Sequence, residues 1–274
     1  MLLTPRHGSN PVLHLEGDPA AIGELFVRQR RRLVTLLTEL SSEQWAQPSR
    51  CDGWSVQDVA VHLSSTNWFW EASIRAGLAG EPTTVMAGFD PVASPAEMVE
   101  ASSMSPDEIV QNLTETGESI AACFAEMKPA DWTKLAESPP GHVTVSAVAH
   151  HGFWDAWIHE RDVLLPLGEV PTEAPDEVMA SLRYVASLSP AVVLNSGVTQ
   201  AGSFGVAPTD IDESFHVEIG SDVTVRDGLG ASEFVLSGNA VELVETLSFR
   251  ASLDLGIPDD LAWAFTGISD VFDR

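Results

Sequence analysis

The segment from His150 to Asp162, HHGFWDAWIHERD, carries the densest set of side chains that can do chemistry in this chain. Within it, His151, Asp155 and His159 are spaced four residues apart. Four residues advance a helix by about 400°, so a helix places the three side chains in one stripe. Two side chains four apart on a helix can bind the same metal ion. Asp155 and His159 are therefore a candidate pair of metal ligands.

A third ligand has to come from another helix. His62 is the candidate, because it is the only histidine of the second expected helix. Zinc accepts such a mixture of nitrogen and oxygen ligands, and three protein ligands leave one position open, as in catalytic zinc sites. The spacing alone is also typical of a surface pair or a satisfied core group. On spacing alone, a hydrogen-bonded core role for His62 is favoured over a ligand role.

Helix start signals followed by apolar residues three and four apart dominate the first part of the chain. The expected helices run from Asp18-Pro19 to Leu40, from Ser55 to Gly77, from Ser105 to Met127 and from Thr144 to Leu167. Between the last two, Pro139-Pro140-Gly141 predicts a break in regular structure. Four long helices with modest links are typical of a four-helix bundle, and this arrangement would bring His62 towards Asp155 and His159.

The chain changes character after Gly168, where helical spacing gives way to short alternating runs. The expected elements are a helix over 175–194 that Pro190 limits, strands at Phe215–Ile219 and Val223–Val225, a possible strand at Glu233–Leu236 and a helix from Asn239. We predict an α+β protein with two domains. Residues 1–170 form the four-helix bundle and residues 171–274 form a smaller α+β domain.

The charge of the chain limits its partners. Forty acidic and fourteen basic residues give a net charge of −26. Such a field repels phosphate backbones and anionic lipid headgroups, so neither nucleic acid nor a membrane surface is an expected partner. We expect no transmembrane helix and no signal peptide. Cys51 and Cys123 are the only cysteines and are expected to be reduced, which favours a cytoplasmic protein, either a monomer or a homodimer.

Several neighbours of the candidate ligands have a structural and a functional interpretation. Asp162 either holds the outer ring nitrogen of His159 or is a solvated acid. Arg161 is expected in a surface ion pair, and Cys51 as a packed thiol rather than a nucleophile. The basic run Arg28–Arg32 is expected on a solvated face. The aromatic residues expected in the bundle core and the pocket wall are Trp54, Trp68, Trp70, Trp154 and Trp157.

Two runs, CDGWSVQDVAVHL at 51–63 with Trp45 before it, and DAWIHERD at 155–162, resemble the signatures of a known family. It is the mycothiol-dependent maleylpyruvate isomerase family, a branch of the DinB-like metal-binding four-helix bundles. The resemblance implies that His62, Asp155 and His159 bind one divalent metal, with zinc the expected ion. Asp155 stands where the family's best-known member has a glutamate, so either the helices lie closer or His151 replaces or supports it. The run from Gly238 resembles the family's C-terminal domain, which implies that Arg250 faces the cofactor pocket.

The family uses mycothiol, a low-molecular-weight thiol, as cosubstrate. The resemblance therefore implies an isomerase or transferase in which a metal-activated thiolate attacks a small electrophilic substrate. Two alternatives stay open. One is a non-haem iron enzyme that uses oxygen, because two histidines and a carboxylate also suit iron. The other is a bundle that binds a small ligand without catalysis. We assign no catalytic base from the sequence.

Overall fold

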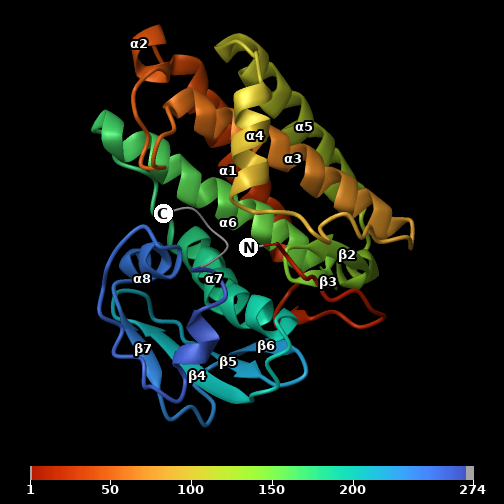
Figure 1. Cartoon of the computed structure of the whole chain (residues 1–274). Coiled ribbons are helices and arrows are strands. Elements are labelled where there is room, and N and C mark those ends of the chain that lie inside the picture. The colour runs from red at the N-terminus through yellow and green to blue at the C-terminus, as the bar shows by residue number, and fades with distance from the viewer. Residues whose placement is uncertain (1, 270–274) are drawn as a thin grey trace.

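The computed structural model describes residues 2–269, and its first part is a bundle of four long helices. The bundle consists of α1 (Ala21–Glu39), α3 (Val56–Leu78), α5 (Pro106–Glu126) and α6 (Val145–Leu164). Figure 1 shows it in the upper half of the molecule, with α6 on the side that faces α7. Nearly every residue of α6 is buried, so the side chains of this helix meet other helices on all sides. The predicted bundle is confirmed.

Local capping explains where three of these helices begin. Ser55 and Ser105 each form a complete capping box with the acid three residues later, and the Thr144 hydroxyl accepts from the amide of Ala147. The start expected at Asp18-Pro19 is displaced, since α1 begins at Ala21 and has no side-chain cap. The Asp18 carboxylate instead accepts from the Ala20 amide in the preceding turn.

Short elements that the sequence did not indicate connect the long helices. They are α2 (Ser42–Trp45), α4 (Ala93–Ala101), the 3₁₀ turn η1 (Pro129–Thr133) and the hairpin of β2 (Leu135–Ser138) with β3 (Gly141–Thr144). The predicted break at Pro139-Pro140-Gly141 is the turn of this hairpin. Helix α3 packs closely on β2, because Gly77 has no Cβ to collide with the carbonyl oxygen of Leu135.

The second part is a mixed sheet covered by helices, which confirms the α+β class. The sheet order is β1-β6-β5-β4-β7; β1 and β7 are parallel to their neighbours and the other pairs are antiparallel. The elements are β1 (Leu13–Leu15), η2 (Leu165–Leu167), α7 (Pro175–Asn195), β4 (Gly202–Pro208), β5 (Phe215–Ile219), β6 (Val223–Asp227), β7 (Val235–Gly238), α8 (Ala240–Leu247) and η3 (Ala262–Phe265). Strand β4 was not expected from the sequence.

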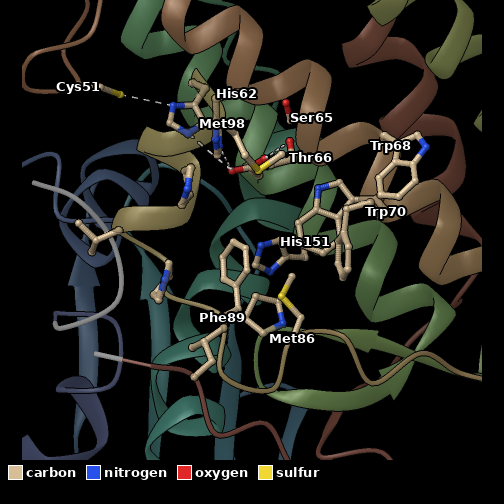
Figure 2. A pocket seen from close by; sticks show the side chains of 18 of the residues that line it. Cys51, His62, Ser65, Thr66, Trp68, Trp70, Met86, Phe89, Met98 and His151 are labelled. Atoms are coloured by element: carbon tan, nitrogen blue, oxygen red, sulfur yellow. Dashed lines mark hydrogen bonds and ion pairs between the residues drawn. The ribbon is translucent and has the colours of Figure 1, made fainter. Parts of the chain in front are cut away.

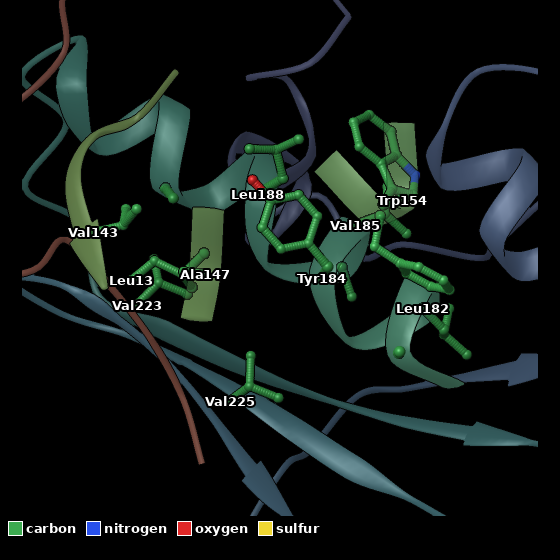
Figure 3. Close-up of a cluster of buried hydrophobic side chains, with 14 of the residues drawn as sticks. Leu13, Val143, Ala147, Trp154, Leu182, Tyr184, Val185, Leu188, Val223 and Val225 are labelled. Atoms are coloured by element: carbon green, nitrogen blue, oxygen red, sulfur yellow. The ribbon is translucent and has the colours of Figure 1, made fainter. Parts of the chain in front are cut away.

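The sheet and the bundle share one hydrophobic core. Strand β1 comes from the N-terminal segment but pairs with β6, where Leu13 lies opposite Val223. Figure 3 shows Leu13 and Val223 beneath Tyr184 and Leu188 of α7 and Ala147 of α6. The domain boundary at residue 170 therefore stays a prediction, and the sheet contains strands from both sides of that boundary.

Helix α7 corrects the expectation that Pro190 limits this segment. The helix continues through Pro190 to Asn195. A proline removes one backbone hydrogen bond, but almost all of α7 is buried and its packing outweighs that loss. Among the described residues, α7 alone has the length and composition of a membrane-crossing helix, and 94% of its apolar window is buried inside the protein, as in a core helix.

Only part of the basic run of α1 forms the solvated face that the sequence suggested: Arg28 and Arg31 are exposed, but Arg30 and Arg32 face other helices. Arg30 is buried and donates to Asn67, to Gln29 and to the carbonyl of Gly152. Arg32 forms ion pairs with buried Glu160 and Glu177. The partners of Arg30 and Arg32 lie on other helices and come close only when those helices pack against α1. The spacing within α1 alone therefore gave no sign that these charges are paired.

Candidate active site

The three predicted ligands lie together between two facing helices. His62 comes from α3, and Asp155 and His159 come from α6, one turn apart. The Asp155 Oδ1 atom lies 3.6 Å from His62 Nε2 and 3.6 Å from His159 Nε2. The two imidazole rings meet edge to face with centroids 4.9 Å apart. Packing of α3 on α6 therefore brings together residues that are about ninety positions apart in the chain, as Figure 2 shows around His62.

Other contacts hold the far side of two of the three candidate ligands. The Thr66 hydroxyl donates to Asp155 Oδ2 at 3.1 Å, and His159 Nδ1 pairs with Asp162 Oδ2 at 2.9 Å. The atoms that face one another are Asp155 Oδ1 and the Nε2 atoms of His62 and His159. Burial alone would raise the pKa of Asp155, but its bond to His62 and the charges of both histidines hold the pKa well below its usual range. Asp155 is therefore an ionised carboxylate.

The three facing atoms fit a small divalent cation. They lie within 4.8 Å of one another, among buried or half-buried side chains. A tetrahedral zinc ion with bonds of about 2.0–2.1 Å needs ligand atoms roughly 3.3–3.4 Å apart. The 3.6 Å separations from Asp155 Oδ1 need only a small adjustment to meet that requirement. The aspartate side chain is long enough here, so its missing methylene does not prevent a shared site.

His151 does not join these atoms. Its Nδ1 atom is 2.5 Å from the Tyr184 hydroxyl, and its ring packs against Trp70. Burial lowers the pKa of His151 to about 4, so the ring is neutral. The alternative in which His151 replaces Asp155 is therefore not supported by the geometry. His151 instead lines the cavity beside the three candidate ligands.

Asp162 is the residue that holds His159 in place. Its side chain is fully buried and also receives the Nε–H groups of Arg50 at 3.0 Å and Arg250 at 3.1 Å. Burial would raise the pKa of Asp162, but the bond to His159 and the charges of Arg250 and Arg50 lower it well below its usual range. Of the two interpretations from the sequence, the structure shows the one in which Asp162 bonds the outer nitrogen of His159.

Arg50 was missed by the sequence analysis. It reaches Asp162 on α6 and Glu245 on α8, so it ties the bundle to the sheet domain next to the site. Arg161 also pairs with Glu245, and it is buried rather than on the surface as expected. Nothing in the local sequence distinguishes these arginines from solvated ones, because their partners lie on other elements.

Cys51 belongs to a second cluster that shares His159. The Cys51 Sγ atom is 3.6 Å from His159 Nδ1 and 3.3 Å from Asp162 Oδ2. Burial and the charge of Asp162 raise the pKa of the Cys51 thiol to about 12. Two of the three members of this cluster are already engaged, because His159 Nδ1 is bonded to Asp162 and Asp162 also accepts from two arginines. The cluster of His62, Asp155 and His159 is thus the better cation site, and Cys51 is the packed thiol that was expected.

A cavity of about 380 Å³ opens beside the candidate ligands. Trp54, Trp68 and Trp70 form part of its wall, whereas Trp154 and Trp157 are buried in the core. Figure 2 shows Trp68, Met86, Phe89 and Met98 around the space that His62 faces. Arg250 also lines the cavity, where its guanidinium bonds Asp162 and lies 3.5 Å from Cys51 Sγ. Arg250 thus lies at the cavity wall, and its contact with a cofactor stays a prediction.

Comparisons with known proteins agree with this fold. The family described as mycothiol maleylpyruvate isomerase N-terminal domain matches residues 26–164, just over half of the chain. A crystal structure of the mycothiol-dependent maleylpyruvate isomerase superposes with a TM-score of 0.58 at 16% identity, covering 85% of this chain and 89% of that one. A histidine-to-alanine mutant of that enzyme gives 0.57 and 15%, with the same coverage. At these identities the likeness shows a common fold. No curated protein matches.

Proposed function

Because this chain belongs to the mycothiol maleylpyruvate isomerase N-terminal domain family, we propose that it is a metal-dependent enzyme that joins a mycothiol-type thiol to a small electrophile. The reaction is an isomerisation if the thiol is released again, and a transfer if it stays attached. The observation that carries the proposal is the convergence of His62 Nε2, Asp155 Oδ1 and His159 Nε2 at the wall of one cavity.

The residues of the site have separate roles in this proposal. His62, Asp155 and His159 would hold one divalent cation, and zinc suits their two nitrogens and one oxygen. When bound, zinc lowers the pKa of a coordinated thiol, so that the thiol reacts as a thiolate. Asp162 keeps the proton of His159 on Nδ1 and thereby presents Nε2 to the cation. Thr66 fixes the rotation of the Asp155 carboxylate.

The remaining wall shapes the reaction space. Apolar side chains exclude water from the reacting sulfur, which preserves its nucleophilicity. Cys51 is not the nucleophile, because its thiol stays protonated near neutral pH. Arg250 is proposed to contact the thiol cosubstrate from the His159 side of the cavity, where its guanidinium bonds Asp162. No side chain in the cavity has the position and pKa that would single it out as a catalytic base.

One alternative has a specific observation in its favour. Two histidines and one carboxylate also form the facial triad of non-haem iron enzymes. Zinc is favoured here because the family that matches the chain uses a thiol cosubstrate. A bundle that only binds a small ligand would need neither metal.

The test is metal content by inductively coupled plasma mass spectrometry on the purified protein. We expect about one zinc per chain in the wild type and none in the Asp155→Ala, His159→Ala double variant. His62→Ala should lose metal while its helical circular dichroism persists. Iron in place of zinc would move the proposal to oxygen chemistry. A folded protein that stays free of metal after reloading with zinc would refute the catalytic proposal.

A further inference from the structure

Exposed apolar side chains gather at the mouth of the cavity. Nine large apolar side chains are exposed among residues 2–269. Four of them line this one cavity: Trp68, Val85, Val92 and Met98, of which Trp68 is 68% and Val85 64% exposed. Apolar surface that is left in water and concentrated in one place marks a binding site. The mouth of the cavity is therefore built to receive an apolar molecule.

The inner wall of the cavity is apolar as well. Leu3, Phe69, Met86, Phe89 and Pro95 line the space between the mouth and the candidate ligands. They come from the N-terminal segment, from α3 and from the 81–98 segment that includes the start of α4, so three separate parts of the chain contribute apolar surface. Figure 2 shows Met86, Phe89, Met98 and Trp68 on different sides of the same space. A ligand that fills this part of the cavity exchanges water for carbon over most of its surface.

The described wall offers little to a carboxylate. Arg250 is the only lysine or arginine among the lining residues, and its Nε–H donates to both oxygens of buried Asp162. Its charge is thereby balanced by an acid that has no access to solvent. A divalent cation that is joined to Asp155 and to one thiolate has no net charge left to attract a second anion. The whole chain carries a charge of −26, which repels anionic substrates further.

From these observations we infer that the electrophile is an uncharged molecule with an apolar body, aromatic or alkyl, and not a dicarboxylate such as maleylpyruvate. This inference rests on the proposed function. The apolar body lies between Trp68, Phe89 and Met98, and the reactive carbon faces His62, Asp155 and His159. The volume of about 380 Å³ suits a molecule of one or two rings. With an aryl chloride, a carbon–sulfur bond forms, chloride leaves with the electron pair of the carbon–chlorine bond, and the thiol proton passes to solvent.

The first test measures binding with N-phenyl-1-naphthylamine, a neutral apolar probe whose fluorescence rises in an apolar site. We expect saturable binding to the wild-type protein, weakened about tenfold or more by Val85→Glu and by Met98→Glu. Both positions are exposed, so the variants should fold. Val170→Glu is the matched control, because Val170 is 88% exposed and lies outside the cavity, and it should bind like the wild type. Fumarate, an unreactive dicarboxylate, should not displace the probe.

Two results would overturn the inference. One is displacement of the probe by fumarate; the other is equal binding by the mouth variants and the wild type. A turnover assay with mycothiol separates this inference from the proposed function. A higher kcat/KM for maleylpyruvate than for 1-chloro-2,4-dinitrobenzene overturns the substrate class and leaves the enzyme proposal intact. If the protein holds no metal and still binds the probe, the apolar ligand class is supported and the catalytic proposal is refuted.

Discussion

Replacement of Asp162 by asparagine tests how the buried carboxylate supports the site. The carboxylate accepts from His159 Nδ1 and from the guanidinium groups of Arg50 and Arg250, with no exposure to solvent. Asparagine has nearly the same shape but carries no charge, and its NH₂ group faces donors. The Asp162→Asn variant therefore removes one acidic partner from each of two buried or half-buried arginines and releases His159 to rotate.

Removing one partner of a buried ion pair costs about 3–5 kcal/mol. The lower end applies to Asp162, because the Arg50 side chain keeps 22% exposure and the Arg250 side chain 11%, and Arg50 retains Glu245. We expect Asp162→Asn to lower the free energy of unfolding by about 3 kcal/mol. Loss of the carboxylate that orients a metal-binding histidine weakens metal affinity by about 10–100-fold, so zinc binding should fall by that factor.

The unfolding energy is measured by urea denaturation of protein kept free of metal with chelator, so that metal binding does not add to the stability. Zinc affinity is measured by competition with a chromophoric chelator. The control is Asp176→Asn, since Asp176 forms an equally short ion pair with Arg28 but both side chains are about half exposed. That exposed pair should contribute about 1 kcal/mol or less. If Asp162→Asn cost no more than Asp176→Asn and bound zinc like the wild type, the positioning role of Asp162 would be refuted.

Two further predictions concern other buried groups. The Glu137 carboxylate accepts from the amides of Val85 and Met86, so Glu137→Gln places an NH₂ group against a backbone donor. We expect the free energy of unfolding, measured by urea denaturation, to fall by about 1–3 kcal/mol, and hydrogen exchange at those two amides to become faster. Unchanged exchange would contradict this prediction. Burial, helped by the charge of Arg183, lowers the pKa of His150 from 6.5 to about 4. Between pH 6.5 and pH 4 the unfolded chain binds a proton at His150 that the folded protein does not bind. The contribution of neutral His150 to the free energy of unfolding is therefore complete above pH 6.5 and is lost as pH falls towards 4. His150→Gln should make the fall in urea midpoint between pH 7 and pH 5 shallower, and an unchanged slope would count against this assignment.

Local signals in the sequence were sufficient to predict the bundle. Ser55 and Ser105 cap helices through residues three positions away, and Thr144 does the same. The four-residue spacing of Asp155 and His159 is likewise a property of a single helix turn. The family signatures around these residues then singled out His62 as their partner, and the structure places it against them. All these inferences depend on interactions within a few residues or on one recognisable motif.

Contacts between distant segments were not predictable in the same way. The burial of Arg30, the pairing of β1 with β6 and the continuation of α7 through Pro190 each depend on what packs against that segment. The local sequence does not predict these features, because the sequence around a charged residue, a short strand or a proline does not show whether protein or water surrounds it. Packing energy from the shared core decides these cases.

The sequence by itself determined the class of the fold, the helices that carry the chemistry and the identity of three candidate ligands. Only the tertiary structure decided which atoms of Asp155 and His159 remain available, since Thr66 bonds one carboxylate oxygen and Asp162 bonds Nδ1. It also decided the character of the cavity, because Leu3, Trp68 and Met98 come from segments that meet only in the folded chain. The physical reason is range: capping and periodicity act within about one helix turn, whereas a cavity wall forms from side chains that the folded core brings together.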